Sequence, residues 1–237
     1  MSLREVEYII QPLNFHVIYL KKENYIAPEK IPIWLHNLQE YFSSKRQIEF
    51  DCKHVALLVI DMQRFFLDSD SHAFIPTSVN IIEPIKKLVE LFYKKRLPVI
   101  FIKYGLSKQD RKNSAMDKWW ADILSLSDPL SAIHPTFAIK TPYILSKPSY
   151  DPFYKSNFEE ILRKEKVTQV VISGVHTHLC VETTARNAFS RGYTVWLPID
   201  CLATYNEELH LGSLRAAAHC FGIPTTSALI LEELKKS

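Results

Sequence analysis

Six short apolar runs, each separated from the next by a loop and a segment of helical periodicity, constrain the fold of this chain most strongly. The runs cover residues 54–61, 97–104, 142–147, 167–174, 193–200 and 223–230. Apolar side chains occupy successive positions in these runs, which is typical of parallel strands buried on both faces. Strands that alternate with helices predict βαβ crossovers. We therefore expect an α/β fold with three α/β/α layers, Rossmann-like, around a central, mainly parallel six-stranded sheet.

Two of the intervening segments carry apolar residues at helical spacing. In the first segment, the residues near one helical face are Val79, Ile82, Leu88, Val89 and Phe92. In the second segment, one helical face holds Val181, Ala185, Ala188 and Phe189. Gly192 follows the second segment and suits the position just beyond a helix C-terminus.

The first fifty residues follow a different pattern. They predict a short strand over residues 15–20 and a helix over residues 32–42. On that helix one face would hold Trp34, Leu38, Tyr41 and Phe42. We expect residues 1–50 to form an N-terminal arm packed on the core or on a neighbouring subunit, and residues 51–237 to form one domain.

Composition excludes several classes of function. The formal net charge of the 237-residue chain is +3, which is too small to indicate nucleic acid or an acidic membrane as a partner. Its four cysteines have no C-x-x-C spacing, its five glycines form no phosphate-binding motif, and no apolar stretch reaches about 20 residues. These features predict a cytoplasmic protein that acts on a small molecule.

Three reactive side chains follow predicted strands. Asp61 ends the first run, Lys147 ends the third, and Cys180 comes a short turn after the fourth. Each has a structural reading, since such residues often cap a loop, lie in solvent or fill a core. Because ligands of open parallel sheets bind at the carboxyl ends of the strands, the three are expected to converge. A carboxylate, an ammonium and a thiol together suit a cysteine hydrolase.

In sequence, the chain resembles the isochorismatase-like cysteine hydrolase superfamily over residues 54 to about 230. The matching stretches are LLVIDMQRFF, ILSKPSYDPF and VVISGVHTHLCVETTARNAF, in the family's order. The resemblance implies a catalytic triad of Asp61, Lys147 and Cys180. It also implies a cis peptide between Val175 and His176, and an oxyanion hole formed by the backbone N–H groups of His176 and Cys180.

Departures from the family pattern refine this expectation. Nicotinamidases of the superfamily carry an Asp-x-His metal motif after the second strand, where this chain has KYGLSKQD at residues 103–110. We therefore expect no metal and no cofactor. His176 and His178 lack a third zinc ligand at fixed spacing. The acidic stretch 68–72 lacks the glycine of a calcium-binding loop, and we expect it to form a polar loop near the pocket mouth. Isochorismatases that cleave a vinyl ether carry glycine at the position of Cys180.

The residues near these motifs also predict a substrate pocket. Its expected walls are Phe66, Trp119, Trp120, Tyr150, Phe153 and Thr177. Glu182 and Arg186 are spaced as a helical (i, i+4) ion pair, which we expect to be structural.

The sequence therefore predicts a metal-independent cysteine hydrolase that cleaves a C–N bond of a small amide, carbamoyl or ureido compound through a Cys180 thioester. Two alternatives stay open: an isochorismatase-type vinyl ether hydrolase, and a catalytically silent scaffold of the same fold. The resemblance implies a homo-oligomer, either a dimer or a tetramer. The Cys180 thiol is expected to ionise well below the usual pKa of about 8.5 and to react with iodoacetamide faster than Cys52, Cys201 or Cys220.

Overall fold

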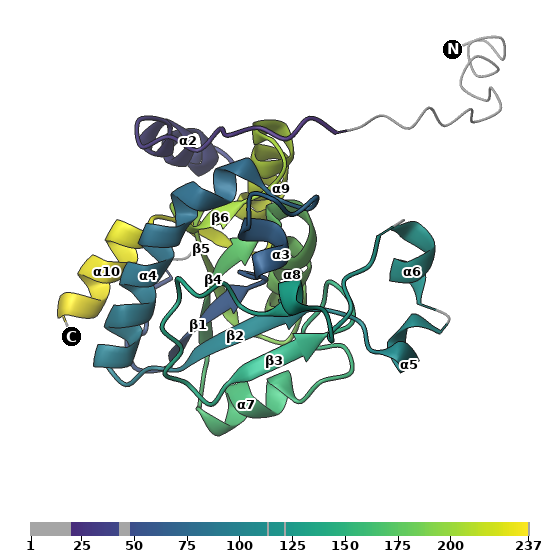
Figure 1. Ribbon diagram of the computed structural model, residues 1–237. Coiled ribbons are helices and arrows are strands. Elements are labelled where there is room, and N and C mark those ends of the chain that lie inside the picture. Colours follow the sequence, from purple (N-terminus) through teal and green to yellow (C-terminus); the bar gives the residue numbers. More distant parts are fainter. Residues whose placement is uncertain (1–19, 43–47, 113, 121, 237) are drawn as a thin grey trace, which may run out of the picture.

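A parallel β-sheet forms the centre of the molecule (Figure 1). The computed structural model describes residues 20–42, 48–112, 114–120 and 122–236. Within these residues the strands are β1 (Val55–Ile60), β2 (Val99–Tyr104), β3 (Ile144–Lys147), β4 (Gln169–Val175), β5 (Thr194–Pro198), β6 (Leu202–Ala203) and β7 (Ile223–Thr225). The order across the sheet is β3-β2-β1-β4-β5-β7, and β6 pairs with the end of β4. Every strand pair is parallel, which confirms the expected fold class.

Helices cover the sheet and complete the three layers (Figure 1). They are α2 (Lys30–Gln39), α3 (Arg64–Leu67), α4 (Val79–Lys94), α5 (Lys108–Arg111), α6 (Ala115–Trp119), α7 (Phe158–Lys164), α8 (Glu182–Ser190), α9 (Glu207–Cys220) and α10 (Ser227–Lys236). Helix α10 packs beside α4, and α8 packs beside α9. None of the helices in these ranges is both long and apolar enough to cross a lipid bilayer.

The sheet has seven strands where the sequence predicts six. The additional strand, β6, has only two residues and carries no strand periodicity of its own. The apolar run 223–230 is also shorter as a strand than expected, because β7 ends at Thr225 and α10 begins at Ser227. Asp200 explains this break: its carboxylate accepts hydrogen bonds from the Ser227 backbone N–H, at 2.7 Å, and from the Ser227 hydroxyl. A carboxylate at this position stabilises the start of a helix.

The buried faces of α4 and α8 differ in part from the predicted stripes. Helix α4 buries Ile81, Ile85, Leu88, Val89 and Phe92, whereas Val79 at its first position is exposed. Helix α8 buries three residues with small or short side chains, Thr184, Ala185 and Ala188, and leaves Phe189 exposed. The helical periods were predicted correctly, but the edges of each stripe were not, because a residue near a face boundary is buried only where a neighbouring element covers it.

The described part of the N-terminal arm packs on the core of its own chain. Trp34 and Leu38 of α2 are buried, and the Trp34 ring lies 5.4 Å from the ring of His210 in α9. The helix ends at Gln39, earlier than predicted, so Tyr41 and Phe42 lie beyond it and are exposed. The strand expected at residues 15–20 falls almost wholly outside the described residues.

One glycine allows the two central strands to approach each other where the site begins. Gly174, in β4, has a φ of +111°, and a Cβ atom there would lie 1.9 Å from the carbonyl oxygen of Ile60 in β1. Asp61, the next residue after β1, also has a positive φ of 52°. Aspartate is among the few residues that adopt this conformation at modest energy. The chain therefore turns sharply at Asp61, beside the end of β4.

Docking of the arm predicts a measurable contribution to stability. Replacing Trp34 by Ala removes a buried indole and its hydrogen bond to Glu207, and we expect the free energy of unfolding to fall by about 3 kcal/mol or more. Ile33 neighbours Trp34 on the same helix but is 59% exposed, so Ile33→Ala should change it by less than about 0.5 kcal/mol. Urea denaturation measures both values. Equal, small losses for the two variants would show that the arm is not part of the folded core.

Candidate active site

Asp61, Lys147 and Cys180 come together at one edge of the sheet. Asp61 follows β1, Lys147 is the last residue of β3, and Cys180 lies in a π-helical turn, Thr177–Val181, that follows β4 and is called here the Cys180 turn. The Lys147 Nζ donates a hydrogen bond to Asp61 Oδ2 at 2.8 Å and another to Cys180 Sγ at 3.1 Å. Three side chains far apart in sequence thus form one contiguous cluster.

The sheet topology explains this convergence. From β1 the chain first adds β2 and β3 on one side, then returns to place β4 on the other side of β1. The loops that leave β1 and β4 therefore diverge. The carboxyl ends of these two strands border the crevice in which open α/β sheets bind ligands. Asp61 and Cys180 follow these two strands. Lys147 reaches them from β3, where it is the one buried residue of the strand.

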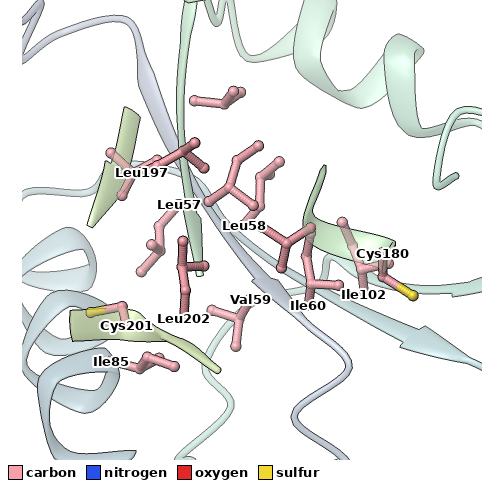
Figure 2. Close-up of a cluster of buried hydrophobic side chains, with 14 of the residues drawn as sticks. Leu57, Leu58, Val59, Ile60, Ile85, Ile102, Cys180, Leu197, Cys201 and Leu202 are labelled. Carbon is pink, nitrogen blue, oxygen red and sulfur yellow. The ribbon is translucent and has the colours of Figure 1, made fainter. Parts of the chain in front are cut away.

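The cluster is almost completely shielded from solvent. Asp61 and Lys147 are 0% and 1% exposed, and Cys180 is 5% exposed. In Figure 2 Cys180 lies at the edge of the central apolar cluster, near Ile60 and Ile102, and its sulfur points away from the other labelled side chains. The third donor of Lys147 contacts the carbonyl oxygen of Ser149 at 3.2 Å. Asp61 Oδ1 accepts no hydrogen bond from the described residues and is left available as an acceptor.

Burial and mutual charge shift the pKa values of all three groups. Burial raises the pKa of the Asp61 carboxyl above its usual value, although the Lys147 ammonium opposes the shift. Burial alone would lower the pKa of Lys147, but the charges of Asp61 and Cys180 outweigh it and the net shift is upward. The site therefore holds a charged lysine beside a carboxylate that is more basic than a free one.

The expected low pKa of Cys180 is wrong. Burial, followed by the neighbouring charge of Asp61, raises the pKa of the thiol to about 12, and Lys147 only partly offsets this. The sequence could not reveal how deeply the sulfur lies, and Asp61 and Lys147 leave little net charge to favour a thiolate. Cys180 is therefore a neutral thiol at pH 7, next to a carboxylate that can take its proton.

The Cys180 turn is held by side chains from other elements. The peptide bond between Val175 and His176 is cis. The Thr177 hydroxyl is 2.9 Å from Nδ1 of His210, and Nδ1 of His178 is 2.6 Å from the Thr204 hydroxyl. Thr177 was expected to line the pocket, but this buried contact with α9 turns its side chain away from it. The contacts fix the position of the turn that carries the sulfur.

Sequence reasoning missed a glutamine that joins the ends of β1 and β2. Gln63 is fully buried, and its amide nitrogen donates to the carbonyl oxygens of Tyr104 and Ser131 at 2.8 and 2.9 Å. Its amide oxygen accepts the backbone N–H of Tyr104 at 2.8 Å. Gln63 thereby braces the loop that carries Asp61. A polar residue two positions after a strand-ending aspartate was the available signal.

Cys180 lies in the wall of a cavity of about 250 Å³. Its walls are formed by Lys22, Phe65, Phe66, His72, Ala73, Tyr104, Met116, Trp120, Asp122, Tyr150, His176, Leu179, Cys180 and Tyr205. Three of the expected wall residues, Phe66, Trp120 and Tyr150, lie there, and the Trp120 indole N–H donates to the Tyr150 hydroxyl at 2.7 Å. His72 at the wall belongs to the polar loop 68–72, which was expected near the pocket mouth.

Two other aromatic residues expected in the pocket lie outside it. Trp119 ends α6 and is 80% exposed, because the turn of the helix directs it away from its neighbour Trp120. Phe153 packs its ring against Phe158, at 4.7 Å between centroids, and under the guanidinium of Arg191. Adjacent or nearby positions in sequence did not predict which ring faces the cavity.

The predicted ion pair in α8 is present. Arg186 donates to Glu182 Oε1 from Nε at 2.9 Å and from Nη2 at 2.8 Å. The other oxygen of Glu182 accepts a hydrogen bond from the Ser213 hydroxyl at 2.6 Å. The pair thus joins α8 to α9 as well as neighbouring turns of one helix.

Among the described residues, no group of three or more His, Cys, Asp or Glu side chains is arranged to hold a metal ion.

The raised pKa of Cys180 predicts its alkylation behaviour. At pH 7.5 iodoacetamide should label the exposed Cys220 well before Cys180, and the rate at Cys180 should rise about tenfold for each pH unit up to at least pH 10. Peptide mass spectrometry resolves the two sites. A labelling rate at Cys180 that is already constant across neutral pH would contradict a thiol buried beside Asp61.

Comparisons with known proteins identify the family of this chain. The family model described as Isochorismatase domain matches residues 55–228. Nicotinamidase 3 of Arabidopsis thaliana is 32% identical over 187 residues, which cover 77% of this chain and 89% of the relative.

Solved structures share the fold. A cysteine hydrolase from Pseudomonas syringae pv. phaseolicola 1448A aligns with a TM-score of 0.72 at 22% identity, covering 81% of this chain and 99% of that chain. The N-carbamoylsarcosine amidase of Thermoplasma acidophilum aligns with a TM-score of 0.63 at 24% identity, covering 73% and 96%. With the family match over most of the chain, these findings confirm the resemblance: the chain belongs to the isochorismatase family of hydrolases.

Proposed function

We propose that this protein is a metal-independent cysteine amidohydrolase that cleaves a C–N bond of a small amide, carbamoyl or ureido compound. The observation that carries the proposal is the contact of Lys147 with both Asp61 and Cys180 at the end of a small cavity. A thiol, a base and a cation in contact are the parts that acyl transfer through cysteine requires. Neither His176 nor His178 is needed as a base.

The first half of the reaction forms a thioester. As Cys180 Sγ attacks the substrate carbonyl carbon, the thiol proton passes to Asp61, which burial makes a stronger base than a free carboxylate by raising its pKa. Lys147 stays charged and stabilises the sulfur while it loses the proton. The oxyanion binds to the backbone N–H groups of His176 and Cys180, as the family resemblance implies. Asp61 then returns the proton to the leaving nitrogen, and the C–N bond breaks.

The second half of the reaction releases the acid. Water attacks the thioester carbonyl carbon while Asp61 takes one of its protons. The C–S bond breaks, the sulfur regains that proton from Asp61, and the carboxylic acid leaves. One amide and one water thus become one acid and one amine or ammonia, and the enzyme returns to its starting protonation state.

The comparisons support C–N cleavage as the reaction type. One relative is named a nicotinamidase, and one structural neighbour is named an N-carbamoylsarcosine amidase. We propose a substrate other than nicotinamide, because residues 103–110 lack the Asp-x-His motif of nicotinamidases. Vinyl ether hydrolysis is disfavoured, since Cys180 stands where the ether-cleaving isochorismatases carry glycine.

The proposal predicts that amide turnover depends on Cys180 and Asp61. Cys180→Ala removes the nucleophile and Asp61→Asn removes the base, so each should lower kcat at least about 10³-fold in an assay of ammonia release from a panel of small amides and ureido compounds. Cys220→Ala changes an exposed thiol that does not line the cavity and serves as the matched control, with unchanged kcat.

Three outcomes would count against the proposal. Full activity of a folded Cys180→Ala variant would remove the nucleophile from the mechanism. Loss of activity in EDTA that zinc restores would remove the metal-independent part. Turnover of a vinyl ether without ammonia would favour the isochorismatase-type alternative instead.

A further inference from the structure

A lysine from the N-terminal arm lies at the cavity whose wall includes Cys180. Lys22 precedes α2, and its Nζ donates hydrogen bonds to the carbonyl oxygens of His72 and Phe74 at 2.8 and 3.0 Å. The Nζ also lies 5.6 Å from the centre of the Tyr205 ring, which forms another part of the wall. An ammonium has three N–H donors. Two donate to carbonyl oxygens, and the third has no partner among the described residues, on a side chain that is exposed to solvent.

The charge of Lys22 has no acidic partner in the part of the chain that the structure describes. Among the described residues, no carboxylate oxygen lies within ion-pair distance of its Nζ. Asp122 is the acidic residue of the wall; its Oδ2 lies 2.9 Å from Nε2 of His72, and its side chain is 69% exposed. At the Cys180 end of the cavity, Lys147 and Asp61 form their own ion pair. Lys22 is therefore the cation on the wall whose charge a negatively charged group of a bound ligand would balance.

Lys22 acts on the reactive end of the cavity as well. The pKa of His176 is held well below its usual value, mainly by burial and next by the neighbouring His178. The positive charge of Lys22 adds to this effect. Partial burial lowers the pKa of Lys22 itself. A partly desolvated ammonium gains more from an anion than one in open water does. Most of the remaining wall is aromatic or aliphatic, with Phe65, Phe66, Met116, Trp120 and Leu179 among its members.

We infer that the substrate is a small, flat amide that carries a carboxylate at the end distant from the scissile bond, and that Lys22 binds this carboxylate. This inference rests on the proposed function. The apolar walls accept a planar body, and the volume of about 250 Å³ lies below the roughly 300–1,000 Å³ of pockets for drug-sized ligands. The arm thereby contributes a specificity-determining residue to the site of the domain on which it packs.

A matched pair of amides tests the inference. Benzamide and 3-carbamoylbenzoate share the ring and the scissile amide and differ only in the carboxylate. We expect kcat/KM of the wild-type protein to be at least about tenfold higher for 3-carbamoylbenzoate, which is typical of one charge-assisted hydrogen bond. Lys22→Met should abolish this preference, mainly by raising KM for 3-carbamoylbenzoate. Lys22→Arg should retain most of it.

A neighbouring lysine provides the control. Lys21 is adjacent in sequence, its side chain is 83% exposed and lies 3.4 Å from Glu23, and it is not part of the cavity wall. Lys21→Met removes the same charge from the arm and should leave both substrates unchanged. An equal effect of Lys21→Met and Lys22→Met would show that only the overall charge of the arm matters, and would overturn the inference.

The outcomes separate this inference from the proposed function. If the wild-type protein hydrolyses benzamide as well as 3-carbamoylbenzoate, the Lys22 inference is wrong and the amidohydrolase proposal stands. If neither amide is hydrolysed, isothermal titration calorimetry measures the binding of the same two compounds and still tests the role of Lys22. Binding of 3-carbamoylbenzoate that is lost in Lys22→Met supports the inference, whereas equal binding of both compounds, or no binding of either, contradicts it.

Discussion

The ion pair between Lys147 and Asp61 is the interaction on which the rest of the site depends. Removing two charges from water costs several kcal/mol each, and such a pair is tolerated only where its remaining hydrogen bonds are satisfied. Lys147 meets this requirement with Asp61, Cys180 and the Ser149 carbonyl oxygen. Asp61 Oδ1 does not, since it has no partner among the described residues. In the proposed mechanism, this oxygen receives the thiol proton and returns it.

The surrounding structure serves to keep this pair in place. The absence of a Cβ at Gly174 lets β4 approach β1, and the positive φ of Asp61 turns its carboxylate toward the end of β3. Gln63 braces the same loop against β2. Because both ions are buried, a small displacement would leave an uncompensated charge, which is strongly destabilising. Burial also explains why Cys180 rests as a thiol rather than a thiolate.

The carboxyl ends of β1, β2, β3 and β4 were predictable from the sequence to within one residue. The convergence of Asp61, Lys147 and Cys180 was predictable as well, because the continuous apolar runs and the carboxyl-end rule indicate which residues meet. Side-chain direction was not: Trp119 and Trp120 are adjacent, yet only Trp120 faces the cavity. The direction of the Cys180 pKa shift was missed because burial depth depends on tertiary packing. Lys22 was missed because nothing near it in sequence indicates that the arm reaches the cavity.

The claim most central to this mechanism is that the acyl group passes through the sulfur of Cys180. Acid quenching during turnover of 3-carbamoylbenzoate, or of whichever amide is hydrolysed fastest, followed by intact-protein and peptide mass spectrometry, tests it directly. The mechanism predicts a mass increase equal to the acyl group of the substrate, confined to the peptide that contains Cys180 and removed by hydroxylamine. Steady turnover without any such adduct, under conditions where acylation outpaces hydrolysis, or an adduct on another residue, would contradict it.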